Sequence, residues 1–454
     1  MAKTKKVYEC KKCGHIQNVW SGQCPNCNSW GSLVESTIEK KSNKKIYENK
    51  DDNQASKLKD IKIDQDLRIK SDYEEFDRTL GEGLVKDSVS ILTARPGAGK
   101  STLLLQLSKS YADRGYRVIY ISGEESTTQI RNRAERIMKE LPDNIWILST
   151  NSMNQAQRQI EKIDADIVII DSIQTFSLEE FDNKAGSPVQ TVECANRCVE
   201  IAKNVSRKRA FLIIAHMTKS GELAGIRTLE HLVDTVLFLE GKSEEDLRFL
   251  SAAKNRFGPT GEIGLFSMRE EGLVEIKNPS EYFTTERDKE VEGSAISVTK
   301  EGNRLLEIEV ESLVSKSFLP YPQRIAESLR KDKLNILISI LQERAGLNLF
   351  DKNVIIKTTG GLKLKEESID LCIMVSIASS FYKRPIGDKT VFIAEVGLTG
   401  ELKKVPQIDK RIRELERLGY SKCYVAKNST KEKFKDIKVI EKRNISEVLS
   451  AEFS

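Results

Sequence analysis

The sequence predicts an α/β protein with a largely parallel central β-sheet and a separate N-terminal four-cysteine module, and three observations support this prediction. Short apolar runs alternate with amphipathic segments of helical length between residues 72 and 285. One of these runs, Val89-Ser90-Ile91-Leu92, leads into a glycine-containing loop that ends in Lys-Ser, and an apolar helix pattern follows the loop. Two Cys-x₂-Cys pairs lie closer to the N-terminus. Strands that alternate with helices are typical of parallel sheets with helices on their faces.

Size and composition describe a chain of several domains that we expect in the cytoplasm. The 454 residues exceed the usual length of one domain. No apolar run is long enough to span a membrane, and polar residues follow Met1 where a signal peptide would be apolar. Residues 1–50 contain ten lysines, no arginine and four glutamates, whereas the whole chain has a net charge of +5. This asymmetry indicates nucleic acid as a partner, and a solvated lysine-rich surface is the alternative.

The first four cysteines, Cys10, Cys13, Cys24 and Cys27, predict a zinc module within residues 1–35. Each pair can place two thiolates on one side of a tight turn, which suits tetrahedral Zn²⁺. Four thiolates leave no open position on the metal, so the zinc is expected to be structural. Disulfide bonds are the alternative, and a cytoplasmic chain disfavours them.

The remaining chain divides by composition into three segments. Residues 36–70 are polar and charged and are expected to form a flexible linker. The α/β region covers 71–285, and residues 286–454 are long enough for a further domain. We expect strands at 88–92, 117–121, 145–148, 167–170, 210–215, 235–239, 249–254, 263–268, 295–298 and 305–313, and helices at 100–114, 127–139, 152–163, 188–207, 322–344, 366–381 and 407–419.

A phosphate-binding loop is predicted between the strand that ends near residue 92 and the helix that follows. Its residues are Ala94, Arg95, Pro96, Gly97, Ala98, Gly99, Lys100, Ser101 and Thr102. The glycines let backbone N–H groups turn toward a phosphate, Lys100 supplies a positive charge, and the Ser101 hydroxyl can bind Mg²⁺. Alanine stands at position 94 where the pattern usually has glycine, and this smallest of side chains fits. The sequence therefore predicts binding of ATP with Mg²⁺.

Carboxylates at the ends of two neighbouring strand patterns complete the predicted site. Asp171 follows the apolar run at 167–170 and is placed to support Mg²⁺ through water, opposite Ser101. Glu124 follows the strand at 117–121 and could deprotonate the attacking water, with its neighbour Glu125 as the alternative base. An ordinary exposed acid in a loop is the simplest other interpretation of Glu124.

These motifs resemble the bacterial RadA/Sms DNA repair family over essentially the full length and in the right order. The resemblance rests on the four-cysteine module, the loop 96–106, Tyr120-Ile-Ser-Gly-Glu-Glu-Ser126, Leu229-Glu-His-Leu-Val-Asp-Thr235 and Lys254-Asn-Arg-Phe-Gly258. It implies a RecA-like P-loop NTPase core and a C-terminal α+β domain similar to Lon protease. It also implies an ATP-hydrolysing hexameric ring on single-stranded DNA that drives branch migration in homologous recombination. Branched DNA, the recombinase RecA and a replicative helicase are the partners that it suggests.

The resemblance also assigns roles to residues outside the loop. Lys254 and Arg256 belong to the family's own motif and are interpreted as cations that act on the nucleotide of a neighbouring subunit, with DNA phosphate contact as the alternative. His216 occupies the position of a polar sensor, or is a structural histidine. In a RecA-like fold, DNA is held by loops that here would cover about 177–187 and 217–229. The predicted phosphate contacts in these loops are Lys184, Lys219 and Arg227.

A protease activity of the C-terminal domain is not expected. Alignment with the Lon dyad puts Ser368 at the nucleophile position and Arg411 at the base position, 43 residues later. Arginine does not release its proton at a useful pH, and the adjacent Lys410 points to another helix face. We interpret the domain as a scaffold with a basic surface for DNA, formed by Lys403, Lys404, Lys410, Arg411 and Arg413.

The sequence thus favours a DNA-dependent ATPase that acts as a recombination motor. Two other functions remain open at this stage. An ATP-dependent protease or protein remodeller would use the same loop with the Lon-like domain. A passive DNA-binding adaptor would use nucleotide only to stabilise a ring.

Overall fold

The computed structural model describes residues 4–13, 15–17, 19–39, 57–60, 67–216, 226–241, 245–285, 290–319 and 321–453. The chain divides into two compact units, Met1–Gln65 and Asp66–Ser454, and each is described by itself.

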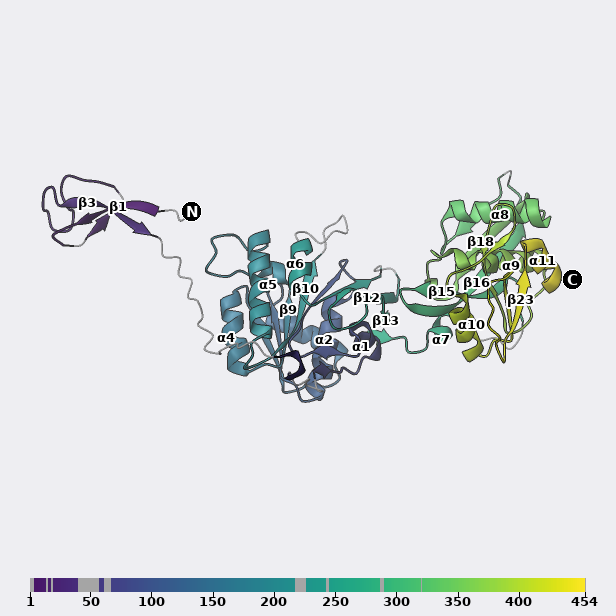
Figure 1. Ribbon diagram of the computed structural model, residues 1–454, viewed down its shortest axis with the longest axis horizontal. Helices are drawn as coiled ribbons and strands as arrows, with labels where there is room; N and C mark the ends of the chain where they lie inside the picture. Colours follow the sequence, from purple (N-terminus) through teal and green to yellow (C-terminus); the bar gives the residue numbers. More distant parts are fainter. Residues whose placement is uncertain are drawn as a thin grey trace. The chain divides into compact units, whose positions relative to one another are not determined.

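The N-terminal unit contains a small antiparallel sheet with the strand order β2-β1-β3 (Figure 1). Its strands are β1 (Thr4–Cys10), β2 (Ile16–Gln17) and β3 (Leu33–Glu39), and a short 3₁₀ helix covers Leu58–Asp60. Cys10 ends β1 and pairs with Leu33 at the start of β3, so the segment 10–33, which contains all four cysteines, begins and ends at the same place. The third strand continues past residue 35 into the predicted linker. Residues 40–56 and 61–66 of that linker lie outside the described part of the chain.

The larger unit begins with a nine-stranded sheet whose order is β14-β13-β12-β11-β6-β10-β9-β7-β8. Six strands run parallel, namely β6 (Val89–Ala94), β7 (Val118–Ser122), β8 (Ile145–Ser149), β9 (Ile167–Asp171), β10 (Ala210–His216) and β11 (Thr235–Glu240). The antiparallel strands β12 (Leu247–Asn255), β13 (Ile263–Arg269) and β14 (Gly272–Glu275) extend one edge. A small hairpin of β4 (Arg68–Ile69) and β5 (Leu84–Val85) precedes β6. The predicted α/β fold with a largely parallel sheet is confirmed.

Helices cover both faces of this sheet (Figure 1). One face packs against α1 (Glu74–Leu80), α2 (Lys100–Asp113) and α3 (Thr127–Ile137), and the other against α4 (Met153–Ile163), α5 (Pro188–Ala202) and α6 (Ile226–Leu232). Alternate residues of β6 enter the two hydrophobic clusters, Ile91 on one face and Leu92 on the other, and every residue of this strand is buried. A strand buried on both faces reads as a continuous apolar run, which is why β6 was recognisable in the sequence.

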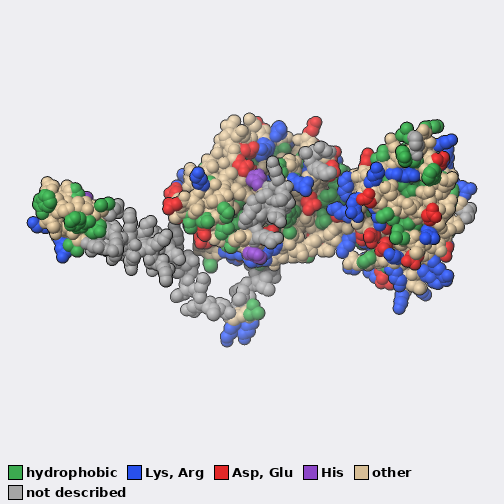
Figure 2. Space-filling model, turned by 90° about the horizontal axis from the view of Figure 1, so that it is seen from above, with side chains coloured by type: hydrophobic (Ala, Val, Ile, Leu, Met, Phe, Trp, Pro, Cys, Tyr) green, Lys and Arg blue, Asp and Glu red, His purple; other side chains and the backbone are tan. Residues whose placement is uncertain are grey.

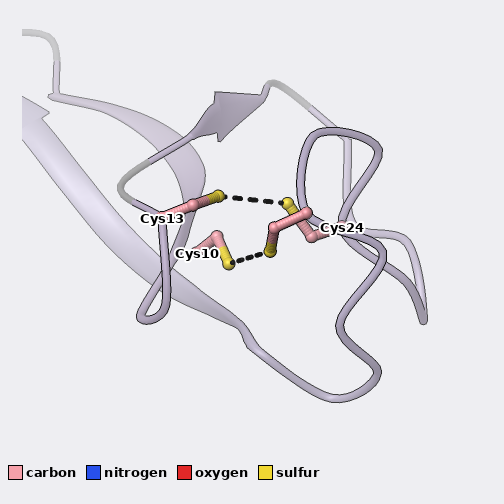
Figure 3. Close-up of side chains that lie close together, drawn as sticks. Cys10, Cys13 and Cys24 are labelled. Atoms are coloured by element: carbon pink, nitrogen blue, oxygen red, sulfur yellow. Dashed lines mark hydrogen bonds between the residues drawn. The ribbon is translucent and has the colours of Figure 1, made fainter.

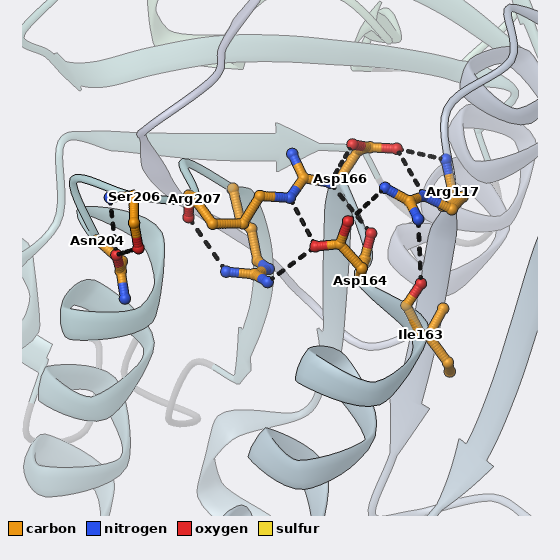
Figure 4. A network of polar contacts seen from close by, with 8 residues as sticks. Arg117, Ile163, Asp164, Asp166, Asn204, Ser206 and Arg207 are labelled. Atoms are coloured by element: carbon orange, nitrogen blue, oxygen red, sulfur yellow. Dashed lines mark hydrogen bonds and ion pairs between the residues drawn. The ribbon is translucent and has the colours of Figure 1, made fainter.

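An ion-pair network ties the loops that enter β7, β9 and β10 at the amino edge of the sheet (Figure 4). Asp164 accepts from Arg207 Nε at 2.7 Å and from Arg117 at 2.7 Å, while Asp166 pairs with Arg207 at 2.5 Å. The Arg117 backbone N–H also donates to Asp166 at 2.8 Å. Three loops far apart in sequence are therefore fixed to one another at the edge opposite the phosphate-binding loop.

The C-terminal part of the larger unit contains a mixed seven-stranded sheet with the order β17-β18-β16-β15-β19-β22-β23. The strands are β15 (Ser294–Glu301), β16 (Arg304–Lys316), β17 (Arg324–Ala326), β18 (Lys352–Thr358), β19 (Thr390–Ile393), β22 (Lys422–Ala426) and β23 (Lys438–Lys442), and β20 (Glu395–Val396) pairs with β21 (Leu402–Lys403) beside it. The helices are α7 (Pro279–Phe283), α8 (Lys331–Ala345), α9 (Asp370–Tyr382), α10 (Ile408–Arg417) and α11 (Ile445–Phe453). The residues from Asp370 to Ser380 of α9 are all buried, so this helix forms the centre of the C-terminal core.

Among the predicted helices, those at 322–344 and 188–207 differ most from the structure, and both are shorter. The helix expected at 322–344 begins at Lys331, because residues 324–326 form β17 and pair in parallel with β18. This pairing is a tertiary contact that overrides a local helical pattern. The helix expected at 188–207 ends at Ala202, since the chain turns at Asn204, whose carbonyl accepts from Arg207 N at 3.2 Å.

Gly264 provides a test of how closely β13 and α1 approach each other. A Cβ atom at this position would lie 2.4 Å from the carbonyl oxygen of Glu75 and 2.9 Å from Thr79 Oγ1. We expect Gly264→Ala to lower the free energy of unfolding by about 1–3 kcal/mol in urea denaturation, because helix and strand must separate. Gly387→Ala is the control, since its Cβ would have no neighbour closer than 3.4 Å. Equal losses in the two variants would contradict the close approach.

Candidate nucleotide and metal sites

The phosphate-binding loop joins the end of β6 to the start of α2. Gly97 and Gly99 adopt φ angles of 78° and 102°, and Gly99 is the N-cap of the helix. These left-handed conformations favour glycine and turn backbone N–H groups toward the end of the helix, where its dipole attracts anions. A Cβ at Gly99 would also come within 2.4 Å of Met268 Cε, so β13 packs directly behind the loop.

Arg248 supports the loop from behind and was not found by the sequence reasoning. Its side chain is 1% exposed, and its Nε donates to the carbonyl oxygen of Ala98 at 3.1 Å. The guanidinium also donates to the carbonyl groups of Glu245 and Leu247. In the sequence, this arginine sits in an ordinary strand pattern between Leu247 and Phe249, and only the tertiary structure places it under the loop.

Lys100 lies within the loop and is nearly buried, with 8% of its surface exposed. Its Nζ donates to the carbonyl oxygen of Ala94 at 2.9 Å, which leaves two of its three N–H donors for a phosphate. Burial lowers the pKa of Lys100, and the nearby carboxylates of Asp171 and Glu124 counteract this effect. A lysine held in this way at the start of α2 has donors that suit a phosphate group.

Asp171 ends β9 at the same edge of the sheet and is 4% exposed. Its Oδ2 accepts a hydrogen bond from Tyr120 Oη at 2.5 Å. Burial and the neighbouring carboxylate raise the pKa of Tyr120 well above its usual value, so the phenol stays a donor and orients Asp171. Ser101 and Asp171 offer the hydroxyl and carboxylate oxygens that Mg²⁺ prefers. The residues present therefore fit the predicted metal, and Tyr120 is a positioning residue that the sequence did not single out.

Glu124 follows β7 and faces the ends of β9 and β10. Its Oε1 accepts from Ser172 Oγ at 2.5 Å and lies 2.8 Å from His216 Nε2. Burial acts to raise the pKa of Glu124, but the hydrogen bonds from Ser172 and His216 and the charge of Lys100 outweigh it, so the pKa is lowered. Glu125 instead forms an ion pair with Arg133 on α3. The geometry thus favours Glu124 over Glu125 as the proton acceptor.

Lys254 and Arg256 lie at the opposite edge of the sheet from the phosphate-binding loop. Lys254 pairs with Val236, and Val236 pairs with Ile91, three residues before the end of β6, so Lys254 is about 10 Å toward the amino edge from Ala94. Its Nζ donates to the carbonyl oxygens of Glu230 at 2.5 Å and Val233 at 2.9 Å. The structure therefore does not bring these cations to the nucleotide site of their own chain.

Asp234 organises this second cluster from a buried position with 1% exposure. Its Oδ1 pairs with Lys203 at 2.9 Å and Arg256 at 3.2 Å, and its Oδ2 accepts from the Val89 backbone N–H at 3.0 Å. Asp234 thereby links the first residue of β6 to the Lys-Asn-Arg-Phe-Gly motif.

The four N-terminal cysteines converge, as Figure 3 shows for Cys10, Cys13 and Cys24. All four sulfur atoms lie within 4.8 Å of one another, and the pairs Cys10–Cys27 and Cys13–Cys24 are each 3.6 Å apart. Tetrahedral Zn²⁺ with Zn–S bonds of about 2.3 Å requires sulfurs about 3.8 Å apart, so the cluster fits zinc. Sulfur atoms at 3.6 Å are not joined in disulfides, and all eight cysteines are free thiols in the structure.

The predicted DNA contacts are only partly described. Lys184 is exposed in the loop between β9 and α5. Lys219 lies outside the described residues, and Arg227 belongs to α6 but its side chain is not described.

Ser368 and Arg411, which the alignment places at the two dyad positions, lie next to each other in the structure. Arg411 NH1 lies 3.4 Å from Ser368 Oγ, and the guanidinium forms an ion pair with Glu366 and donates to the carbonyl oxygen of Val298 at 2.7 Å. Ser368 is 3% exposed and Arg411 1%, so neither forms part of a surface. The expectation that Arg411 contributes to a basic DNA-facing surface is therefore wrong, because its side chain is buried in an ion pair with Glu366.

The fold and these sites define a RecA-like P-loop NTPase of the α/β class with an N-terminal four-cysteine zinc module. Comparison with known families agrees with this definition. Residues 54–222 match the AAA domain, and residues 8–35 match the rubredoxin metal binding domain. Within the described residues, no helix combines the length and apolar character needed to cross a bilayer.

Curated relatives extend the similarity to the whole chain. The DNA repair protein RadA of Bacillus subtilis (strain 168) is 39% identical over 455 residues, which cover 99% of either chain. The DNA repair protein RadA of Streptococcus pyogenes serotype M1 is 39% identical and covers 100% of both chains. That of Listeria monocytogenes serovar 1/2a is 38% identical and covers 99% of both chains. A solved KaiC-like protein from Pyrococcus horikoshii OT3 aligns with 46% of this chain and 98% of its own, at 20% identity and a TM-score of 0.37. The chain belongs to the bacterial DNA repair protein RadA family.

The hydrogen bond from Ser172 to Glu124 predicts a change in the pH dependence of ATP hydrolysis. Because this bond helps to lower the pKa of Glu124, Ser172→Ala should raise that pKa. Glu124 would then be protonated at a higher pH, and the acid limb of the kcat profile should move to higher pH. Ser149→Ala is the control, since that hydroxyl bonds the Glu125 carbonyl group instead. An acid limb that stays in place in Ser172→Ala would show that Glu124 does not set it.

Proposed function

We propose that this chain is a DNA-dependent ATPase that assembles as a ring on single-stranded DNA and promotes branch migration in homologous recombination and repair. The observation that carries the proposal is the separation of the two clusters. Lys100, Glu124 and Asp171 gather at the carboxyl edge of the sheet, while Lys254 and Arg256 lie at the amino edge. Each chain thus offers one half of a site at each edge, which suits a head-to-tail ring in which one subunit completes the site of the next.

The roles of the individual residues follow from their contacts. Bound ATP with Mg²⁺ would supply the phosphoanhydride bond and a divalent charge across its phosphates. Lys100 would bind the phosphates with its two remaining donors, Ser101 would bind the metal, and Asp171 would support the metal through water. Glu124, kept ionised by Ser172 and His216, accepts a proton from the attacking water. Lys254 and Arg256 of a neighbouring subunit would neutralise charge that develops on the phosphates.

The domain roles are part of the same proposal. Residues 71–285 form the ATPase domain, residues 1–35 a structural zinc module, and 286–454 a scaffold for the ring without protease activity. Lys184, Lys219 and Arg227 contact DNA phosphates, and branched DNA, the recombinase RecA and a replicative helicase are the proposed partners. Membership in a DNA repair family supports the choice of DNA. The buried Arg411 beside Ser368 argues against a protease.

Hydrolysis of ATP with and without single-stranded DNA tests the proposal. DNA should stimulate the wild type, whereas Lys100→Ala should lose at least about a hundredfold in rate with or without DNA. Glu124→Gln should lose about 10²–10⁴-fold in kcat and still bind ATP. Lys109→Ala is the control, because this lysine lies on the same helix and pairs with Asp113 at the surface. A wild type whose hydrolysis does not respond to DNA would contradict the motor.

Mixing two inactive variants tests whether Lys254 acts on a neighbouring subunit. Lys254→Ala retains its own loop and base, and Lys100→Ala can still supply Lys254. An equal mixture should recover roughly a quarter of wild-type hydrolysis, since that fraction of interfaces pairs the two intact halves. A mixture of Lys100→Ala with Glu124→Gln should recover none. The alternative is that Lys254 contacts DNA. In that case the mixture of Lys254→Ala with Lys100→Ala stays inactive, and Lys254→Ala weakens DNA binding and reduces the salt dependence of that binding.

A further inference from the structure

The N-terminal unit exposes two of the three tryptophans of the chain. Trp20 is 58% and Trp30 77% exposed, and the adjacent Val19 is also exposed. The third, Trp146, is partly buried in β8. Figure 2 shows hydrophobic side chains gathered on the visible face of this unit, with lysines at its margin. Large aromatic side chains left in water on so small a unit mark an interaction surface.

The cysteine cluster fixes the loops that carry these rings. Trp30 forms a bridge with Gln23, and its ring carbons lie 3.6 and 3.8 Å from the position that a Cβ at Gly22 would take, so the ring rests on the Gly22 backbone. One side of the indole is thus supported and the other is open. Trp20 begins the same turn, which Gln17 holds by donating to Val19 O and Ser21 Oγ at 2.8 Å each.

Two exposed lysines lie on the neighbouring turn. Lys11 and Lys12 stand between Cys10 and Cys13, and the Lys11 backbone N–H donates to Ser32 O at 2.9 Å, two residues from Trp30. The sequence contains no Asp or Glu between residues 10 and 34. A four-thiolate zinc centre carries two negative charges, but residues 1–34 contain five lysines and one glutamate, so the unit stays positive. We call Lys11, Lys12, Trp20 and Trp30 the tryptophan–lysine patch.

We propose that the tryptophan–lysine patch binds single-stranded DNA, with Trp20 and Trp30 stacking on bases and Lys11 and Lys12 contacting phosphates. Separate aromatic platforms beside cations are the combination by which single strands are held without sequence preference. Lysines beside the rings, and the absence of Asp and Glu between residues 10 and 34, favour a polyanion with bases over a protein partner. This site goes beyond the proposed function, which places DNA on the unit that hydrolyses ATP.

Tryptophan fluorescence of the full-length chain detects bases that stack on Trp20 and Trp30. In a Trp146→Phe variant only Trp20 and Trp30 emit, and we expect oligo(dT) to quench this emission with saturation. An abasic oligonucleotide of the same length retains the phosphates but offers no rings to stack on, so it should quench far less. Trp20→Ala or Trp30→Ala should each raise the Kd for oligo(dT) about tenfold, measured from the fluorescence of the remaining tryptophan. Trp30→Phe should raise the Kd much less, because it keeps an aromatic ring. Zinc content is measured in every variant to show that the module is folded.

Several results would overturn the assignment. Absence of quenching by oligo(dT) at full zinc content would exclude DNA at this patch, and equal quenching by the abasic strand would exclude stacking. If Trp146→Phe lowers zinc content, a double variant with Trp20→Phe and Trp30→Phe is used instead. Subtracting its fluorescence from that of the wild type gives the signal of Trp20 and Trp30. DNA stimulation of ATP hydrolysis is measured alongside in the wild type. Its absence contradicts the proposed function, whereas absence of quenching contradicts only the patch.

Discussion

The parallel pairing of β6 between β10 and β11 is the constraint on which the rest of the structure depends. Ala94 at the end of β6 is level with His216 on one side and Leu239 on the other, and Ser122 is level with Asp171. Parallel register places the carboxyl ends of these strands along one edge, so residues more than a hundred positions apart meet there without any local signal. Every residue of β6 is buried, so a one-residue slip would put each of its side chains into the packing of the opposite face.

The same strand connects the two edges of the sheet. Its last residue enters the phosphate-binding loop, and its first residue, Val89, is bonded to the buried carboxylate of Asp234. Asp234 has two cations, Lys203 and Arg256, on its other oxygen, which is how a charge with 1% exposure is compensated. A displacement of the loop along the strand axis would therefore also displace Asp234 and the two cations bound to it.

The parts of the site that the sequence predicted are those whose chemistry is local. The loop 94–102 and the cysteine pairs need only neighbouring residues and turns, and Asp171 and Glu124 follow from the end of an apolar run. Arg248, Tyr120 and Ser172 were missed, because each acts on a residue of another element and looks ordinary in its own strand or turn. The strand at 324–326 was missed for the same reason, and Arg411 was misplaced at the surface because its partner Glu366 is distant in sequence.

One strand, β12, brings the nucleotide loop, the second cluster and the C-terminal domain together. Leu247 at its start packs in the hydrophobic cluster of the C-terminal domain, Arg248 bonds the loop at Ala98, and Lys254 near its end reaches the carbonyl groups that end α6. Arg248 is buried and bonded to the loop, and its neighbour Leu247 packs in another core, so β12 connects the loop to that core. The C-terminal part of the larger unit therefore packs against the strand that supports the phosphate-binding loop, and this contact does not involve Ser368 or Arg411, which are buried elsewhere.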